Sequence, residues 1–440
     1  MNVSVIGLGK LGLCTAASFA SAGIHVIGVD TSEYIVENLK KKECPIDETG
    51  LPALLDQCWE NIEVSYDIDY AVQNSDIAFI VVPTPSMENG VFTNQYLEIV
   101  LRGIGKALQN KNTFFVVDVV STVMPGSCDQ DFKPLLESIS KKRCGEDFGL
   151  VYNPEFIALG SVIENFLNPD MILIGASDER SSNMVRKVYE QTCHNTPEFH
   201  QMSLVNAEIT KLSLNCYVTM KISYANELAA ICEQVAGADV DVVTSAVGAD
   251  SRVGKKYIKG GLGFGGPCFP RDNQAFQAFG KLYNVETRLS PNVVAINDNV
   301  VTRLMYHTQK LSQNARVSVL GLSYKPSTHI VEESQAILLI EKLLERGFEV
   351  RVHDPMAIAS TQALFGERII YSDSVESCIE KSEAIFMMTD WPQYRNLNWK
   401  ELASQAAPGS LLVDAWRNHK NGNAFNYIGL GLGTFENKVV

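Results

Sequence analysis

The sequence predicts an α/β protein with two Rossmann-like, doubly wound domains, joined by a long central helix and a helical dimerisation region. Two observations indicate this fold class. Short apolar runs alternate with helical stretches at both ends of the chain, as in parallel sheets with crossover helices. Between these ends, residues 203–235 read as one helix without proline or glycine. Since 440 residues are too many for one core, we expect three domains at 1–197, 198–312 and 313–440.

The first domain opens with a strand at residues 3–6, a glycine-rich turn, a helix at 13–22 and a strand that ends at Asp30. Gly7 permits the tight turn, Gly9 lets a pyrophosphate approach the helix N-terminus, and Gly12 lets helix and strand pack closely. Asp30 would accept a hydrogen bond from a ribose 2′-hydroxyl and repel a 2′-phosphate. The pattern therefore predicts a dinucleotide site that prefers NAD to NADP, and the alternative is a purely structural glycine turn. The predicted cofactor contacts here are Gly7, Leu8, Gly9, Leu11, Gly12 and Asp30.

Two later strands of this domain end in polar motifs. Ser121 and Thr122 follow the apolar run 114–120, and either hydroxyl could lie near a nicotinamide or the reacting oxygen. The alternative is an ordinary capping hydroxyl. Glu155, in Asn-Pro-Glu-Phe at 153–156, also follows a strand and could activate water. Its alternative is a solvated loop acid.

The central domain carries a long helix and a reactive cysteine. The helix has too many apolar residues for one face, so we expect it to be buried between domains or subunits. Lys211 and Asn215 lie four residues apart on one face, where an amine and an amide can stabilise an alkoxide, although a solvated pair is an equal alternative. Cys268 lies in Gly-Gly-Pro-Cys-Phe-Pro-Arg-Asp at 265–272, just before a helix. A helix N-terminus and a nearby cation lower a thiol pKa, which favours a nucleophile over a structural cysteine.

The third domain repeats the first. Val-Ser-Val-Leu-Gly-Leu at 317–322 repeats Val-Ser-Val-Ile-Gly-Leu at 3–8, and a strand at 350–353 ends in Asp354 as the earlier one ends in Asp30. Tyr-Lys-Pro at 324–326 replaces the rest of the glycine fingerprint, so we expect a different ligand there.

Bulk properties exclude several classes of function. The net charge of −14 argues against nonspecific nucleic-acid binding, and no apolar run reaches the length of a membrane span. The chain enters its first strand without a basic segment, so we expect a cytoplasmic location. Ten cysteines are scattered without a CxxC pair or zinc spacing, and no metal site is expected.

Taken together, these segments resemble the UDP-glucose/GDP-mannose dehydrogenase family over nearly the whole chain. The matching motifs are Gly7–Gly12, Pro83-Thr84-Pro85, Ser121-Thr122-Val123, Asn153–Phe156, Lys211 with Asn215, Gly265–Asp272 and Gly321–Pro326. The resemblance implies an NAD-binding domain, a central dimerisation domain with the cysteine loop, and a C-terminal domain that binds the sugar nucleotide. It also implies NAD as cofactor, with Pro83, Thr84, Pro85, Ser121 and Thr122 as further contacts, and a homodimer or larger homo-oligomer.

The implied chemistry is a four-electron oxidation of a C6 alcohol to a carboxylate. After a first hydride transfer Cys268 adds to the aldehyde, a second hydride leaves a thioester, and water activated by Glu155 or Asp272 hydrolyses it. Lys211 and Asn215 would hold the oxyanion, and Thr122 a bound water. The implied substrate contacts are Glu155, Phe156, Ile157, Lys211, Asn215, Arg252 (on a neighbouring subunit), Tyr257, Phe264, Gly265, Lys325 and Arg417.

Within the family, Arg252, Tyr257 and Phe264 resemble the UDP-glucose branch most. Four positions depart from the family pattern: Ile35, Leu159, Ile330 and Glu332. Leu159 stands where an acid is usual, whereas Ile35 and Glu332 stand where cations are usual. An acid in place of a cation repels phosphate, so Glu332 predicts either weaker NAD binding or a rearranged loop. The loss of two cations together predicts modest NAD affinity.

Other functions remain as alternatives to UDP-glucose oxidation. Another sugar nucleotide (GDP-mannose, a UDP-N-acetylhexosamine or dTDP-glucose) is one. A two-electron hydroxyacid dehydrogenase would need neither Cys268 nor residues 314–440. A non-catalytic NAD and nucleotide-sugar binding protein is disfavoured by the complete set of candidate catalytic residues.

Overall fold

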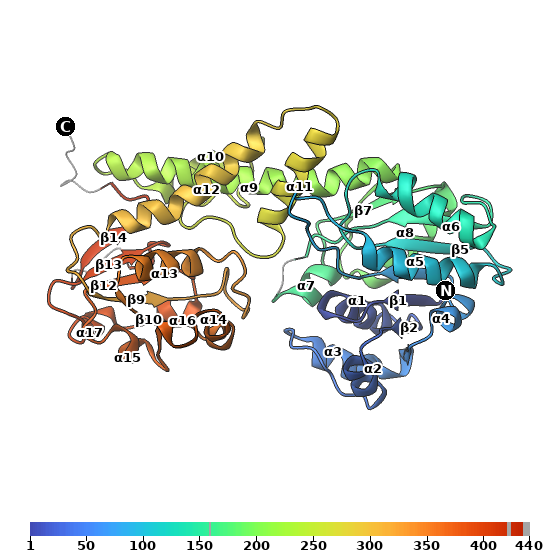
Figure 1. Ribbon diagram of the computed structural model, residues 1–440, viewed down its shortest axis with the longest axis horizontal. Helices are drawn as coiled ribbons and strands as arrows, with labels where there is room; N and C mark the ends of the chain where they lie inside the picture. The colour runs from blue at the N-terminus through green and yellow to red at the C-terminus, as the bar shows by residue number, and fades with distance from the viewer. Residues whose placement is uncertain (158–159, 420–423, 434–440) are drawn as a thin grey trace. The chain divides into compact units, whose positions relative to one another are not determined.

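The computed structural model describes residues 1–157, 160–419 and 424–433. The chain forms two compact units, residues 1–213 and 214–440, drawn blue to green and green to red in Figure 1. The long helix α9 (Leu204–Gln234) contains the boundary between them and agrees with the helix predicted at 203–235.

An eight-stranded sheet forms the centre of the first unit. Its strand order is β3-β2-β1-β4-β5-β6-β7-β8, and every neighbouring pair is parallel except β6 and β7. The strands are β1 (Val3–Ile6), β2 (Val26–Val29), β3 (Ile62–Ser65), β4 (Ile77–Ile80), β5 (Phe115–Val119), β6 (Phe148–Tyr152), β7 (Met171–Ala176) and β8 (Glu198–Met202). The first six follow the doubly wound order expected from the sequence. The antiparallel β7, which follows the short helix α7 (Val162–Leu167), departs from the uniform parallel sheet that the sequence predicted, because an apolar run marks a strand without giving its direction.

Helices cover both faces of this sheet. One apolar cluster packs α1 (Lys10–Ser21), α3 (Leu51–Cys58), α7 and α8 (Glu179–Thr192) on one face. A second cluster packs α4 (Ile68–Asn74), α5 (Gln95–Leu108) and α6 (Lys133–Ser140) on the other. Strands β1, β2, β4 and β5 are buried along their whole length, which is why they read as continuous apolar runs. The helix α2 (Glu33–Lys40) follows β2.

The second unit contains helices and a six-stranded parallel sheet of order β11-β10-β9-β12-β13-β14. The strands are β9 (Arg316–Leu320), β10 (Glu349–His353), β11 (Ile370–Tyr371), β12 (Ala384–Met387), β13 (Leu411–Asp414) and β14 (Asn426–Gly429). The helices after α9 are α10 (Val240–Ala249), α11 (Phe269–Leu282), α12 (Leu289–Tyr306), α13 (Gln335–Glu345), α14 (Ile358–Phe365), α15 (Val375–Ile379), α16 (Pro392–Arg395) and α17 (Trp399–Leu402). This strand order equals that of β3-β2-β1-β4-β5-β6, which confirms the repeat predicted from the sequence.

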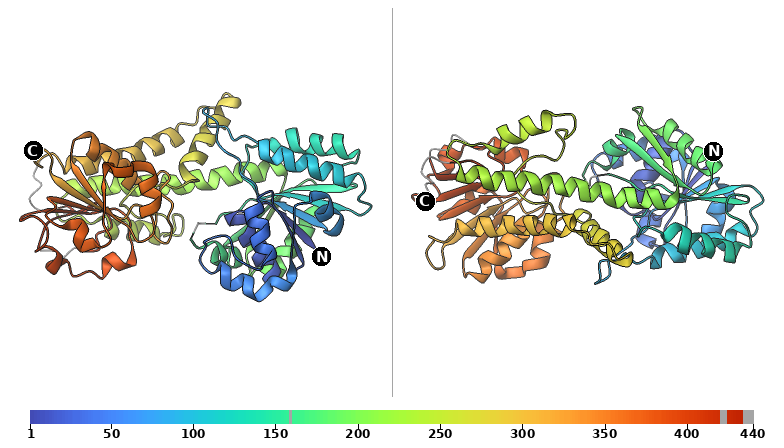
Figure 2. Two further views of the ribbon diagram at one scale, coloured as in Figure 1. Left: turned by 60° about the horizontal axis from the view of Figure 1, so that its bottom comes forward. Right: turned by 90° about the horizontal axis from the view of Figure 1, so that it is seen from above.

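Helix α12 runs beside the C-terminal part of α9 (Figure 2). The Ser223 hydroxyl of α9 donates to the carbonyl of Val293 at 2.8 Å, and Arg303 of α12 forms an ion pair with Glu233 at 2.5 Å. These contacts fix a helical layer within the second unit.

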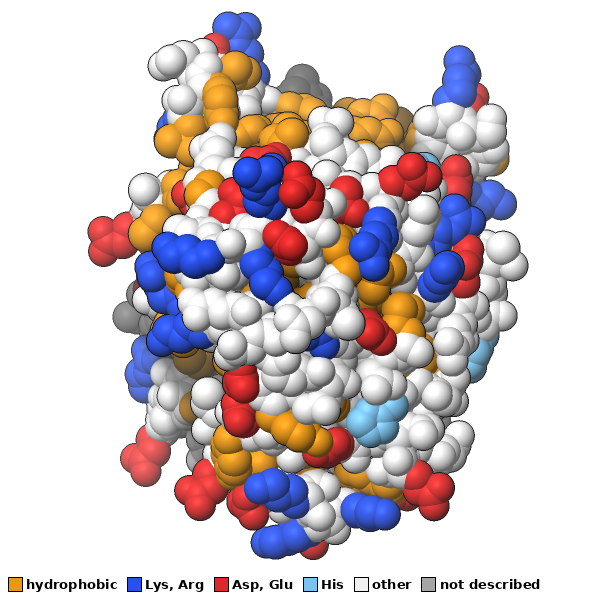
Figure 3. Space-filling view, turned by 90° about the vertical axis from the view of Figure 1, so that its right-hand side faces the viewer, with side chains coloured by type: hydrophobic (Ala, Val, Ile, Leu, Met, Phe, Trp, Pro, Cys, Tyr) orange, Lys and Arg blue, Asp and Glu red, His pale blue; other side chains and the backbone are white. Residues whose placement is uncertain are grey.

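On the face drawn in Figure 3, acidic and basic side chains are interspersed.

Candidate active site

The glycine turn of the first unit has the geometry of a dinucleotide loop. Gly7 has a φ of +94°, and a Cβ there would lie 2.2 Å from the carbonyl oxygen of Val81. A Cβ on Gly12 would lie 1.8 Å from the carbonyl oxygen of Gly7, so helix α1 packs against the turn only with glycine at this position. Above Gly9 the space is open, and no side chain caps the first amides of α1. An anion can therefore approach these amides.

The carboxylate of Asp30 is fixed beside this turn. Its Oδ2 accepts from the Leu8 amide at 2.6 Å, and its Oδ1 accepts from the Ser32 amide at 2.8 Å. Each oxygen keeps acceptor capacity for a ribose hydroxyl. The loop and the acid therefore fit NAD, as the spacing predicted.

The hydroxyls at the ends of β4 and β5 tie these two strand ends together. Ser121 Oγ donates to the carbonyl of Val82 at 2.7 Å and accepts from the Val82 amide at 3.0 Å. Thr84 Oγ1 donates to the carbonyl of Thr122 at 2.6 Å. Thr122 itself is partly exposed. In this structure Ser121 therefore orders the strand ends, and Thr122 is the hydroxyl residue left at the surface.

Glu155 lies in a polar cluster at the end of β6. The Tyr189 hydroxyl is 2.6 Å from Asn153 Oδ1 and 3.1 Å from Glu155 Oε1. The Lys211 ammonium donates to the Glu155 carbonyl and lies 4.6 Å from the centre of the Phe156 ring. The sequence-predicted residues Glu155, Phe156 and Lys211 are thus brought together.

The pKa of Glu155 suits acid–base chemistry near neutral pH. Desolvation by the surrounding protein raises the pKa to about 7, although the Tyr189 hydrogen bond and the Lys211 charge lower it. A carboxyl with such a pKa can both accept and release a proton at neutral pH.

Two members of this cluster were missed by sequence reasoning. Tyr189, on α8, is fully buried and left no local signal in the sequence. Asp118 is fully buried in β5, and neither of its carboxylate oxygens has a hydrogen-bond partner among the residues that the structure describes. Burial, together with the negative charge of Glu155, raises the pKa of Asp118 well above its usual range. An acid within the apolar run 114–120 is visible in the sequence and could have indicated this site.

The candidate nucleophile lies in the second unit. Cys268 is exposed and directly precedes helix α11, whose first turn contains Pro270. The Asp272 amide donates to the Cys268 carbonyl at 2.9 Å, and the buried Asp272 carboxylate accepts from Asn215 Nδ2 at 2.6 Å. Asn215 and Asp272 are thus paired within one turn of the thiol. The rings of Tyr257 and Phe264 both contact Phe269 edge-on at the start of α11.

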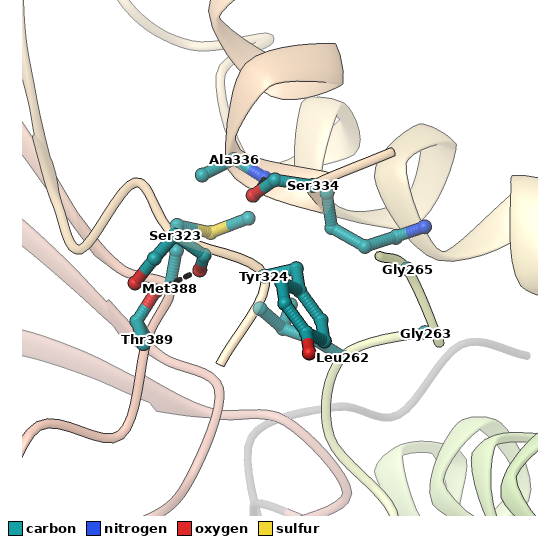
Figure 4. Close-up of a pocket in the computed structure, with 10 residues that line it drawn as sticks. Leu262, Gly263, Gly265, Ser323, Tyr324, Ser334, Ala336, Met388 and Thr389 are labelled. Atoms are coloured by element: carbon teal, nitrogen blue, oxygen red, sulfur yellow. Dashed lines mark hydrogen bonds between the residues drawn. The ribbon is translucent and has the colours of Figure 1, made fainter. Parts of the chain in front are cut away.

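The glycines before Cys268 permit close packing with the C-terminal domain. A Cβ on Gly265 would lie 2.2 Å from the carbonyl oxygen of Glu333, and one on Gly266 would lie 2.6 Å from the Tyr324 ring. The Gly266 amide donates to the carbonyl of Glu332 at 3.0 Å. Beside these contacts is a cavity of about 10 Å³, the size of one water molecule (Figure 4). It is lined by Leu262, Gly263, Gly265, Ser323, Tyr324, Ser334, Gln335, Ala336, Met388 and Thr389.

The repeated glycine turn of the C-terminal domain differs from the first where a ligand would bind. Gly321 has a φ of +89°, and the Leu322 amide donates to Asp354 Oδ2 at 2.7 Å, as Leu8 donates to Asp30. Asp354 is buried, however, and its two oxygens also accept from Trp391 Nε1 and from three further backbone amides, those of Ser323, Met356 and Ala357. This acid is therefore saturated with protein donors, which agrees with the expectation of a different ligand.

The remaining predicted substrate residues occupy separate places. Arg417 is buried, and its guanidinium donates to both oxygens of Asp241 and to the carbonyls of Gly260, Ala415 and Leu430. A direct role in binding would require an exchange of these partners. Arg252 is exposed and paired with Asp250, and the Lys325 ammonium lies 5.9 Å from the Tyr324 ring.

Three of the four family departures lie within the described residues, whereas Leu159 lies outside them. Ile35 packs against the apolar cluster of the first unit. The Ile330 carbonyl accepts from the Tyr324 amide at 3.1 Å, and that of Glu332 accepts from Gly266. In the parts of the chain that the structure describes, no group of acids, cysteines and histidines could hold a metal, and no helix is long and apolar enough to cross a membrane.

Comparison with known proteins assigns each region to one family. The models of the UDP-glucose/GDP-mannose dehydrogenase family match over residues 1–193 (NAD binding domain), 205–299 (central domain) and 318–421 (UDP binding domain). The chain is 33% identical over 403 residues to the UDP-glucose 6-dehydrogenase AglM of Haloferax volcanii, covering 90% of this chain and 93% of that protein. It is 32% identical to a UDP-glucose 6-dehydrogenase of Rickettsia bellii, covering 92% of each.

Solved structures give the same result. A UDP-glucose dehydrogenase from Pyrobaculum islandicum matches with a TM-score of 0.89 and 33% identity, covering 98% of both chains. A UDP-D-ManNAc dehydrogenase from Pyrococcus horikoshii matches with a TM-score of 0.84 and 25% identity, covering 98% of this chain and all of that one.

Proposed function

This chain belongs to the UDP-glucose/GDP-mannose dehydrogenase family, and we propose that it oxidises the C6 alcohol of UDP-glucose to the carboxylate of UDP-glucuronate. Residues 1–193 are the family's NAD-binding domain, so the chain is an NAD-dependent dehydrogenase of this type. The observation that carries the four-electron route is the exposed Cys268 at the start of α11, with the Asn215–Asp272 pair beside it. A two-electron dehydrogenase needs no such thiol.

NAD, when bound, accepts a hydride from C6 in each of the two oxidations. Loss of the first hydride and of the hydroxyl proton gives an aldehyde. The Cys268 thiol then loses its proton and its sulfur adds to C6, giving a thiohemiacetal anion whose C–H bond releases the second hydride to leave a thioester. Water adds to the thioester carbonyl, the C–S bond breaks, and the thiol regains its proton.

Donors and acids of this chain have distinct roles in these steps. Lys211 and Asn215 donate to the negative oxygen that develops on C6. Glu155 or Asp272 accepts the proton of the attacking water. A pKa of about 7 supports Glu155 in this role, because a neutral solution keeps much of it ionised. Thr122 holds a water at the end of β5.

The test is the number of NADH molecules formed per UDP-glucose consumed. Wild-type protein should form two, and Cys268→Ser should turn over slowly or stall after the first oxidation. Cys144→Ser is the matched control, because Cys144 precedes β6 and so lies at the opposite end of that strand from Glu155. One NADH per sugar, or full activity in Cys268→Ser, would contradict the thioester route.

If no NADH forms with UDP-glucose, we expect another sugar nucleotide to be the substrate. UDP-N-acetylhexosamines, GDP-mannose and dTDP-glucose are the compounds to assay next. Binding of NAD and a sugar nucleotide without turnover would favour the non-catalytic binding protein instead.

We also propose that the protein is a homodimer that pairs through α9. Tyr217, Tyr224 and Ile231 are exposed at intervals of seven residues, and Val235 is exposed just beyond the helix. A helix in water seldom presents such an apolar stripe, and a second copy of the chain would cover it. Sedimentation should give a dimer, and Tyr224→Glu should weaken it. A monomeric wild type would contradict this proposal.

A further inference from the structure

Glu48 occupies an unusual place for an acid. It lies in the segment between α2 and α3, and its side chain is only 1% exposed. Its Oε1 accepts from the Val162 amide at 3.1 Å, and its Oε2 accepts from the Gly160 amide at 3.3 Å. The same carboxylate lies 3.6 Å from the ammonium of Lys10. One buried carboxylate thus contacts the segment after Glu155 and the first residue of α1.

Lys10 is the cation in this arrangement. It directly follows Gly9 in the dinucleotide loop and begins helix α1. A cation at a helix N-terminus opposes the helix macrodipole, so Lys10 is unfavourable there unless an anion compensates it. Glu48 is one such anion, and a bound pyrophosphate at the same helix end would be a second.

The segment contacted by Glu48 carries the candidate base. Glu155 lies seven residues before Val162. At the other end, the Asn153 amide donates to the Val119 carbonyl at 3.0 Å, and its side chain donates to the Leu173 carbonyl at 2.8 Å. The sheet therefore holds Asn153, two residues before Glu155, and Glu48 holds Gly160 and Val162, five and seven residues after it.

We propose that Lys10 contacts the NAD pyrophosphate and that Glu48 is a positioning residue, which joins the occupied dinucleotide loop to Gly160 and Val162, the described backbone that follows Glu155. The NAD-binding domain is sufficient for the Lys10 contact, whereas the role of Glu48 in turnover also rests on the proposed function. Lys10 supplies a positive charge, whereas the side chains of Ile35 and Glu332 do not. NAD should therefore bind more tightly than the loss of those two cations alone would predict.

Lys10 is tested by NAD titration of the full-length protein in the absence of a sugar nucleotide. Lys10→Met should raise the NAD dissociation constant on the order of tenfold and weaken its dependence on salt, because a charged contact is lost. Lys40→Met is the matched control: it removes the same charge from an exposed ion pair with Glu37 on α2. Equal dissociation constants in the two variants would overturn the pyrophosphate contact, whatever the activity of the enzyme.

Glu48 is tested by comparing two substitutions in turnover. Glu48→Gln keeps an oxygen that accepts from one backbone amide, whereas Glu48→Ala keeps none. Glu48→Gln should retain a kcat within a few-fold of the wild type, and Glu48→Ala should lower kcat more than it raises the KM for the sugar nucleotide. Equal kcat values in the two variants would overturn the positioning role. If Glu48→Ala does not fold, hydrogen exchange at the Val162 amide in Glu48→Gln decides the question, since the positioning role requires protection to remain there.

The link between the two residues is tested by a double-mutant cycle. The effects of Lys10→Met and Glu48→Gln on the NAD dissociation constant should be less than multiplicative in the double variant, because each removes the same ion pair. Multiplicative effects would show that Glu48 does not position Lys10.

Discussion

Replacing Asp118 by valine should stabilise the first unit, and the gain should increase with pH. The side chain is fully buried in β5, and within the described part of the chain neither carboxylate oxygen has a hydrogen-bond partner. The strand on both sides of it is valine, so the substituted residue matches its surroundings. Removal of a buried polar group without a partner relieves about 1–3 kcal/mol.

The pH dependence follows from the raised pKa of this carboxyl. Above the ordinary Asp pKa of about 3.9, the unfolded chain releases the proton that the folded protein still holds. The contribution of Asp118 to the free energy of unfolding is therefore greatest below that pH. It falls by about 1.4 kcal/mol per pH unit as pH rises, until the folded-state pKa is reached. For a unit of 213 residues this slope corresponds to about 3–6 °C in Tm per pH unit.

The assay is calorimetry from pH 5 to pH 8 on wild type, Asp118→Val and Asp118→Asn. The transition of the first unit is the one that NAD raises, because NAD binds its folded form. Glu155 has the same sign of pH dependence and remains in all three proteins, so the differences report Asp118 alone. Both variants should lose the Asp118 contribution to the slope, and valine should give the higher Tm because it also removes the polar group. A difference between wild type and Asp118→Val that is constant with pH would refute the reasoning.

Three further predictions concern both units. Tyr189→Phe removes the hydrogen bond that lowers the pKa of Glu155, so the acidic limb of the kcat–pH profile should move to higher pH; an unchanged limb would separate Glu155 from catalysis. Asp241→Asn leaves the buried guanidinium of Arg417 without its charge partner and should destabilise the second unit by about 3–5 kcal/mol, measured as a lower calorimetric transition that NAD does not raise. Gly7→Ala places a Cβ 2.2 Å from a backbone carbonyl at a φ of +94°, so NAD titration should show no binding at concentrations that saturate the wild type.

Local patterns predicted most of the fold. The glycine turn after β1, the acid after β2 and their repeat in the second unit follow from steric and hydrogen-bonding needs of neighbouring residues. Such steric and hydrogen-bonding requirements involve residues close together in the chain, so a sequence pattern can indicate them. The antiparallel direction of β7 was not predicted, since an apolar run marks a strand without giving its direction.

The residues of the candidate site were predicted, but the hydrogen bonds and ion pairs that set their charges were not. Cys268, Glu155 and Lys211 were expected from their motifs. The hydroxyl of Tyr189, which reaches Glu155 from 34 positions away, was not expected. The ion pair of Arg417 with Asp241, 176 positions earlier in the chain, was not expected either.

The sequence by itself therefore determined the class of fold, the dinucleotide turn and the identity of the candidate nucleophile and base. Only the tertiary structure decided the protonation of that base, because desolvation and the approach of distant side chains exist only in the folded chain. It likewise decided that Asp30 keeps capacity for a ligand while its counterpart Asp354 is saturated with protein donors. Asp30 and Asp354 follow the same local pattern, yet Asp354 also accepts from Trp391, 37 positions later in the chain, and so has less capacity for a ligand.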